Sequence, residues 1–216
     1  MRAYKFLNAQ FGLKSLYERR LKQSRIQELN DPFELTPYDL TDFVIRQSFL
    51  QTRDGIGADR GMLCLSAAWC DPVIWAHYSD SHQGLCLGFE IPEIHGNPES
   101  DESQHVAYIS KPLPFPFDYE HLPDPERFAI VQQILFTKYE HWAYEQEIRV
   151  WALLQNEENG LHYLEFDDKL KLVEVIMGAR STVTESSITR ALGTLTGAIK
   201  ISKSRAAYDR FEMVEE

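Results

Sequence analysis

The chain has 216 residues, of which 44% are hydrophobic and 25% are charged. This is an ordinary globular composition, so one well-cored domain spanning residues 1–216 is expected. The formal net charge of -11 disfavours nucleic acid and anionic membranes as partners, because the long-range field repels them, although a local basic groove is not excluded.

Targeting and redox signals favour a cytoplasmic protein. The first residues, Met1–Leu7, are too few and too polar for a signal peptide. No stretch approaches the roughly 18 apolar residues of a membrane span. The odd set of three cysteines, Cys64, Cys70 and Cys86, contains no Cys-x-x-Cys pair. It therefore predicts neither a disulfide framework nor a structural zinc site, and we expect no metal.

The first half of the chain is expected to alternate short strands with helices. Apolar residues at helical spacing predict a helix over about residues 13–21. Thr36, followed by Pro37, is expected to cap a second helix, and Asp71 with Pro72 to open a short third one. Compact apolar runs predict strands at 3–7, 62–66 and 85–91.

The second half adds the longest predicted helix and a predicted hairpin. Residues 95–104 are polar and acidic, and we expect a mobile surface loop there. Asp124 and Pro125 mark the start of a helix with a broad apolar face. Two strand-like runs joined through Asn159-Gly160 predict a hairpin. The hairpin strands are 148–154 and 161–166, further strands are expected at 106–109, 172–177, 199–202 and 210–214, and Thr184 is expected to cap the last helix.

These elements predict the fold class. Short strands and scattered helices without regular βαβ alternation are typical of an α+β fold. We therefore expect a single domain built on a bent mixed or antiparallel sheet with surrounding helices.

A block of polar and aromatic residues from Cys64 to Phe89 is the first candidate for chemistry. Trp75 and Tyr78 stand at i and i+3 of the expected helix, and packing in the core is the simpler interpretation of that pair. A metal site formed by His77, His82 and Cys86 is disfavoured, because histidines five residues apart suit neither helix nor strand geometry. A cysteine–histidine nucleophile is also disfavoured, since thiols in apolar strands are usually inert.

The second block runs from Trp142 to Arg149. Glu145 and Glu147 are two residues apart at the start of an expected strand, so both carboxylates are predicted to share one face with Arg149. One interpretation is a solvated ladder with a salt bridge. The other is a catalytic carboxylate held in place by the arginine.

Motifs along nearly the whole chain resemble a bacterial and phage family known as domain of unknown function 2971. The matching pieces are Tyr4-Lys5-Phe6, Asn30-Asp31-Pro32-Phe33-Glu34, Cys64-Leu65-Ser66, Trp75-Ala76-His77-Tyr78, His82-Gln83-Gly84, Tyr144-Glu145-Gln146-Glu147-Ile148-Arg149 and Val175-Ile176-Met177-Gly178.

More distantly, the order of elements resembles ADP-ribosyltransferases. That resemblance implies an ADP-ribosyltransferase-like fold and NAD as substrate. Glu147 would be catalytic with Glu145 beside it, Lys5 would contact the ribose, and Ser66 or Tyr78 the nicotinamide. The superfamily has histidine or arginine where this chain has Lys5.

The full set of residues expected to bind NAD is Lys5, Ser66, Trp75, Tyr78 and Arg149. A carboxylate would stabilise the positive charge that develops on the ribose, and an aromatic wall would hold the flat nicotinamide.

Three functional hypotheses follow. The first is an NAD-dependent ADP-ribosyltransferase-like enzyme, a toxin or effector in bacterial or phage defence, with an unknown macromolecular acceptor. The second is a non-catalytic sensor or protein-binding module of a defence system. The third, a hydrolase using the Glu145/Glu147 pair, is disfavoured because glycosidase carboxylates face each other across about 5 Å or more and rarely come from one strand.

Overall fold

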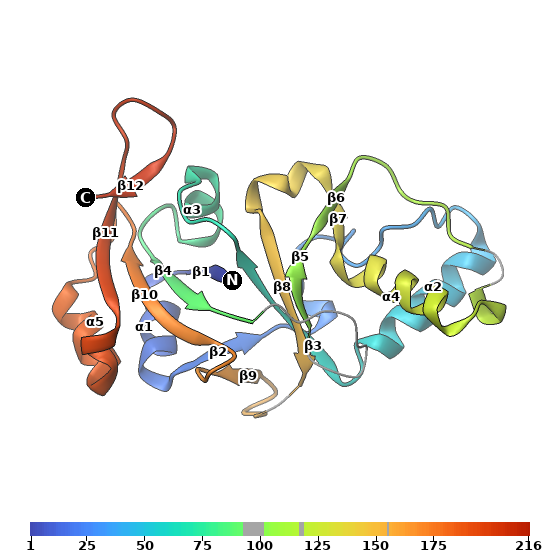
Figure 1. Ribbon diagram of the computed structural model, residues 1–216, viewed down its shortest axis with the longest axis horizontal. Helices are drawn as coiled ribbons and strands as arrows, with labels where there is room; N and C mark the ends of the chain where they lie inside the picture. The colour runs from blue at the N-terminus through green and yellow to red at the C-terminus, as the bar shows by residue number, and fades with distance from the viewer. Residues whose placement is uncertain (93–101, 117–118, 155) are drawn as a thin grey trace.

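The computed structural model describes residues 1–92, 102–116, 119–154 and 156–216 (Figure 1). Its α-helices are α1 (Ala9–Glu18), α2 (Phe43–Ile56), α3 (Pro72–Tyr78), α4 (Asp124–Phe136) and α5 (Glu185–Leu192), with 3-10 helices η1 (Ile26–Glu28), η2 (Tyr119–His121), η3 (Glu140–Glu145) and η4 (Gly193–Ala198). Its strands are β1 (Arg2–Leu7), β2 (Arg20–Gln23), β3 (Arg60–Ser66), β4 (Leu85–Glu90), β5 (Glu102–His105), β6 (Ala107–Ile109), β7 (Thr137–Tyr139), β8 (Glu147–Leu153), β9 (His162–Glu165), β10 (Lys171–Met177), β11 (Lys200–Ala206) and β12 (Met213–Glu215).

The main sheet of the described residues has eight strands in the order β12-β11-β10-β4-β1-β3-β8-β5. The β10–β11 pair is parallel, whereas the pairs linking β10 through β4 and β1 to β3, β8 and β5 are antiparallel. The sheet is mixed and curled, with helices around it (Figure 1). The predicted α+β class with a bent mixed sheet is therefore confirmed.

Alternating side chains divide the core into layers. On β4, Leu85 and Leu87 join a cluster with α1 and α5, whereas Cys86 points to the opposite face and joins a cluster with Trp75 of α3. Farther along the sheet, Met62 of β3 packs with α2 and α4 in a third cluster. Figure 1 shows α1 and α5 together at one end of the molecule and α2 and α4 together at the other.

Two of the three predicted capping residues are confirmed, and one is wrong. Asp71 caps α3 by accepting from the backbone N–H groups of Val73 and Ile74, and Thr184 caps α5. Thr36 caps no helix: its hydroxyl donates to the Glu34 carbonyl (3.1 Å) within a turn. The second helix begins at Phe43 instead, and Asp42 caps it.

The predicted hairpin is also wrong. Asn159 and Gly160 do form a turn with positive φ (53° and 78°). However, β8 pairs with β3 and β5, whereas β9 pairs with the distant β2. The local sequence Asn159-Gly160 determines the turn, whereas tertiary contacts determine which strands pair.

Residues 95–101 of the mobile loop expected at 95–104 lie outside the described residues. Its last part differs from the expectation, because Glu102–His105 forms strand β5 along the edge of the sheet.

The joint between β1 and β3 positions the site. Among the described residues the two strands pair at Tyr4 and Ser66 alone. The residues that follow Tyr4 in β1 and those that precede Ser66 in β3 are not paired with each other. Lys5 Nζ donates to the Cys64 carbonyl oxygen (2.9 Å), so a side chain satisfies a backbone group of β3 beside this pair.

Candidate functional site

A cavity of about 180 Å³ opens at the joint between β1 and β3. The irregular segment 24–34 contributes part of its lining. The lining includes five residues that the sequence had singled out: Lys5, Ser66, Tyr78, Glu145 and Glu147. Residues scattered over more than 140 positions of the chain are therefore brought to one place.

Trp75 is not part of this cavity. Its side chain is fully buried, its indole N–H donates to the Trp69 carbonyl (2.7 Å), and its ring meets Phe6 edge-to-face. The residue packs in the core, as the simpler interpretation of the Trp75/Tyr78 pair predicts, and it does not line the cavity with Tyr78 and Ser66.

Glu145 and Glu147 converge, but for a different reason from the one predicted. Glu145 ends the 3-10 helix η3, Gln146 is left-handed (φ 44°), and Glu147 begins β8. The two carboxylates therefore do not share a strand face. They meet at Lys138, whose Nζ lies 2.7 Å from Glu145 Oε2 and 3.0 Å from Glu147 Oε2.

Arg149 lies beneath Glu147 rather than in the cavity wall. It is completely buried and donates from Nε to Glu147 Oε1 (2.8 Å). Its two terminal nitrogens donate to the Leu135 carbonyl and to the Glu34 carboxylate. Arg149 thus fixes the orientation of Glu147 from behind and does not line the cavity as a residue expected to bind NAD would.

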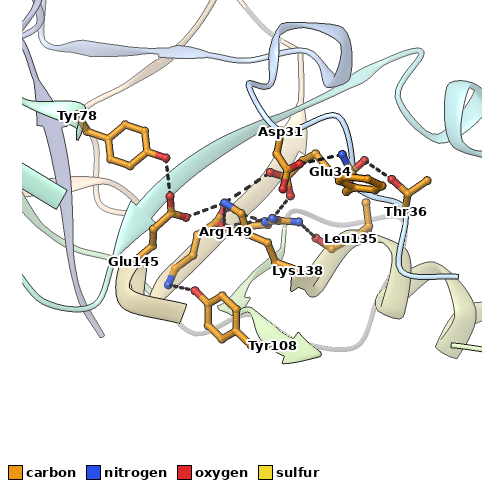
Figure 2. Close-up of polar contacts among 11 residues, drawn as sticks. Asp31, Glu34, Thr36, Tyr78, Tyr108, Leu135, Lys138, Glu145 and Arg149 are labelled. Atoms are coloured by element: carbon orange, nitrogen blue, oxygen red, sulfur yellow. Dashed lines mark hydrogen bonds and ion pairs between the residues drawn. The ribbon is translucent and has the colours of Figure 1, made fainter. Parts of the chain in front are cut away.

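Lys138 is the central residue that sequence reasoning missed. It is buried, and its ammonium is also 3.6 Å from Glu34 Oε2, so it contacts three carboxylates (Figure 2). A lysine in the three-residue strand β7, just after α4, carries no sequence signal for such a role. Glu34 did have one, because it ends the motif Asn30-Asp31-Pro32-Phe33-Glu34, one of the pieces on which the resemblance was based.

Burial and pairing set the ionisation of this cluster. Burial alone would raise the pKa of Glu147, but Arg149 and Lys138 outweigh it and lower the pKa to about 2. Burial would lower the pKa of Lys138, yet the three carboxylates raise it above its usual value. Glu147 and Lys138 are therefore charged at neutral pH, whereas burial raises the pKa of Glu34 despite its two cationic neighbours.

Two tyrosines complete the polar network. Tyr78 Oη donates to Glu145 Oε1 (2.5 Å), and Tyr108 Oη accepts from the backbone N–H of Glu147 (2.8 Å). Burial, followed by the Glu145 carboxylate, raises the pKa of Tyr78, and burial raises the pKa of Tyr108 to about 12. Both phenols remain protonated, and Figure 2 shows Tyr78 and Tyr108 reaching the cluster from different sides.

Two further residues expected to bind NAD, Lys5 and Ser66, donate hydrogen bonds to backbone carbonyl groups. Lys5 holds the Cys64 carbonyl, and Ser66 Oγ donates to the Ala68 carbonyl (2.8 Å). Burial raises the pKa of the Cys64 thiol far above its usual value, which makes it a poor nucleophile.

The histidines of the first block are separated. His77 Nδ1 is 3.0 Å from Tyr144 Oη, whereas the His82 ring stacks on Trp75. Across the residues that the structure describes, no group of three histidine, cysteine or acidic side chains is arranged to hold a metal ion.

Residues 74–150 match the model of the family described as Protein of unknown function (DUF2971). The match confirms the family resemblance over this range, which includes Tyr78, Lys138, Glu145, Glu147 and Arg149. No curated protein matches the chain. No solved structure matches it either. Within the described ranges, no helix combines the length and apolar character needed to cross a membrane.

Proposed function

We propose that the cavity is the active site of an NAD-dependent, ADP-ribosyltransferase-like enzyme, which transfers ADP-ribose to a macromolecular acceptor. One observation carries the proposal: Glu145 and Glu147 line the same cavity as Tyr78 and Ser66, although they come from separate segments. An acceptor in a bacterial or phage macromolecule would make the enzyme a toxin or effector of defence. Three free cysteines favour the reducing cytoplasm as its compartment.

The chemistry needs a fixed negative charge. When the bond between nicotinamide and ribose breaks, its electron pair leaves with nicotinamide and positive charge develops on the ribose. Glu147, with a pKa of about 2, is ionised at neutral pH and is held rigidly by Arg149. Its oxygens keep acceptor capacity for a ribose hydroxyl, because a carboxylate offers about four acceptor sites.

The cavity size limits how NAD would bind. A volume of about 180 Å³ is below the roughly 300–1,000 Å³ of pockets that enclose a whole drug-sized ligand. The cavity would therefore hold the nicotinamide–ribose end, with the Tyr78 ring as a flat wall.

A second function, a non-catalytic sensor module, is favoured because both carboxylates are already paired with hydrogen-bond donors of the protein. Glu147 already accepts from Arg149 and Lys138, and Glu145 from Lys138 and Tyr78. These cations weaken the negative potential that a cationic transition state requires. A rigid, neutralised pocket suits ligand binding without turnover.

The experiment that separates the two is incubation of the purified protein with NAD, with nicotinamide release and NAD binding measured together. The variants are Glu147→Gln and Glu145→Gln, and the control is Glu165→Gln, which changes an exposed acid on β9.

If the protein is the proposed enzyme, it should release nicotinamide from NAD. Glu147→Gln should then reduce the rate of release roughly a hundredfold or more, as for loss of a transition-state contact. Binding without release would favour the sensor. If the protein neither binds NAD nor releases nicotinamide, NAD is rejected as the ligand.

A further inference from the structure

Lys138 also lines a second cavity, of about 360 Å³. Its lining belongs to the turn at residues 33–37, to the segment 109–112 and to strand β7. Its volume falls within the roughly 300–1,000 Å³ of small-molecule pockets.

The turn at residues 33–37 separates the two cavities. Glu34 lines the first cavity, whereas Phe33 and Thr36 line the second. Leu35 between them is fully buried with φ 56°, a left-handed conformation that costs free energy for a residue with a side chain. The backbone is therefore held in an unfavourable conformation at the point where its side chains divide between the cavities.

The second cavity offers flat apolar walls. Phe33 is 72% exposed and Tyr139 is 41% exposed. Pro37 and Pro112 also line the cavity and add rigid apolar surface. Exposed rings of this size at a cavity suit a planar aromatic ligand, which can stack on them.

The second cavity lacks the acidic character of the molecule as a whole. None of the described residues that line it is acidic, although the protein carries a net charge of -11. Lys138 is committed to the three glutamates, so the available cation is the exposed Lys111. The hydroxyls of Thr36, Ser110, Thr137 and Tyr139 are further polar side-chain groups in the described lining.

We infer that this second cavity binds a mononucleotide. Its base would stack against Phe33 and Tyr139, and its phosphate would pair with Lys111 and the neighbouring hydroxyls. The inference concerns binding alone and needs no cleavage of NAD in the first cavity.

The test is calorimetric titration of the whole protein with adenosine 5′-monophosphate, with adenosine and with inorganic phosphate. The monophosphate should bind most tightly, because it alone uses both the rings and the lysine. The affinity for the monophosphate should fall several-fold in Lys111→Gln, as for loss of one exposed ion pair. In the wild type, the affinity should also fall as salt is added. Tyr139→Ala should weaken the monophosphate and adenosine alike.

Two controls keep the outcome specific. Lys14→Gln removes an exposed lysine on α1 and should leave the affinity unchanged. Glu28→Gln alters a residue of the first cavity that pairs with Lys22 and should also leave the affinity unchanged. Equal binding of adenosine and its monophosphate would overturn the inference. So would no binding, or binding that Lys111→Gln leaves unchanged. Because nicotinamide release is not the readout, failure here is distinct from failure of the proposed enzyme activity.

Discussion

Replacing Glu147 by glutamine tests whether the buried charge cluster holds the site together. The substitution keeps the shape of the side chain and removes its charge. Arg149, fully buried, would then keep Glu34 as its carboxylate partner and lose the one that accepts from its Nε. Lys138 would lose one of its three carboxylates.

Two independent arguments give the size of the effect. Breaking a buried ion pair by removing one partner costs about 3–5 kcal/mol. The pKa of Glu147 is 4.5 in the absence of the fold and about 2 within it, a difference equivalent to roughly 3 kcal/mol at about 1.4 kcal/mol per pH unit. For a chain of this length, about 3 kcal/mol lowers the melting temperature by roughly 6–12 °C.

The same pKa fixes the pH dependence. Because the folded-state pKa is lowered, the stabilisation is fully present above pH 4.5 and is lost as the pH falls towards about 2. The stability difference between wild type and Glu147→Gln should therefore be constant near neutral pH. It should then shrink as the pH falls from 4.5 to 3.

Urea unfolding at pH 7, 5, 4 and 3 measures this difference directly, with Glu165→Gln as the exposed control. A difference below about 1 kcal/mol at pH 7, or one that does not change with pH, would refute the account of Glu147 as a buried, paired carboxylate.

Further substitutions test other parts of the structure. Tyr78→Phe removes the hydroxyl that donates to Glu145 (2.5 Å); unfolding in urea should show a loss of about 1.5–3 kcal/mol, typical of a hydrogen bond to a charged group, and an unchanged stability would contradict this contact. Gly84→Ala should lower the melting temperature sharply, because the added Cβ would collide with the Leu7 carbonyl, whereas Gly55→Ala, which meets nothing within 4 Å in α2, should raise stability by about 0.5–1 kcal/mol; equal shifts in the two variants would argue against the close approach at Gly84.

Local signals in the sequence predicted much of the fold. Asp71 and Thr184 cap helices because a side-chain oxygen next to free N–H groups needs no distant partner. The same reasoning failed at Thr36, whose hydroxyl is taken up by the Glu34 carbonyl. It failed again after β8, because the choice between β9 and the distant strand β3 depends on contacts that no local pattern records.

The candidate site was predicted in part. Tyr78, Glu145 and Glu147 stood out through the density of polar and aromatic side chains around them. Lys138 and Tyr108 did not, since each is an ordinary residue in a short strand until the fold brings it to Glu147. Trp75 was included for its neighbours in sequence, although its ring packs in the core.

The joint between β1 and β3 has a mechanical consequence. On one side, β1 is in register with β4 along its whole length, and on the other, β3 is in register with β8 from Arg60 to Ser66. Each pair forms a continuous antiparallel ladder, and the Tyr4–Ser66 pair and the Lys5 side chain connect the two ladders. A change in the angle between the two ladders at this connection would change the width of the cavity while leaving the backbone hydrogen bonds within each ladder intact.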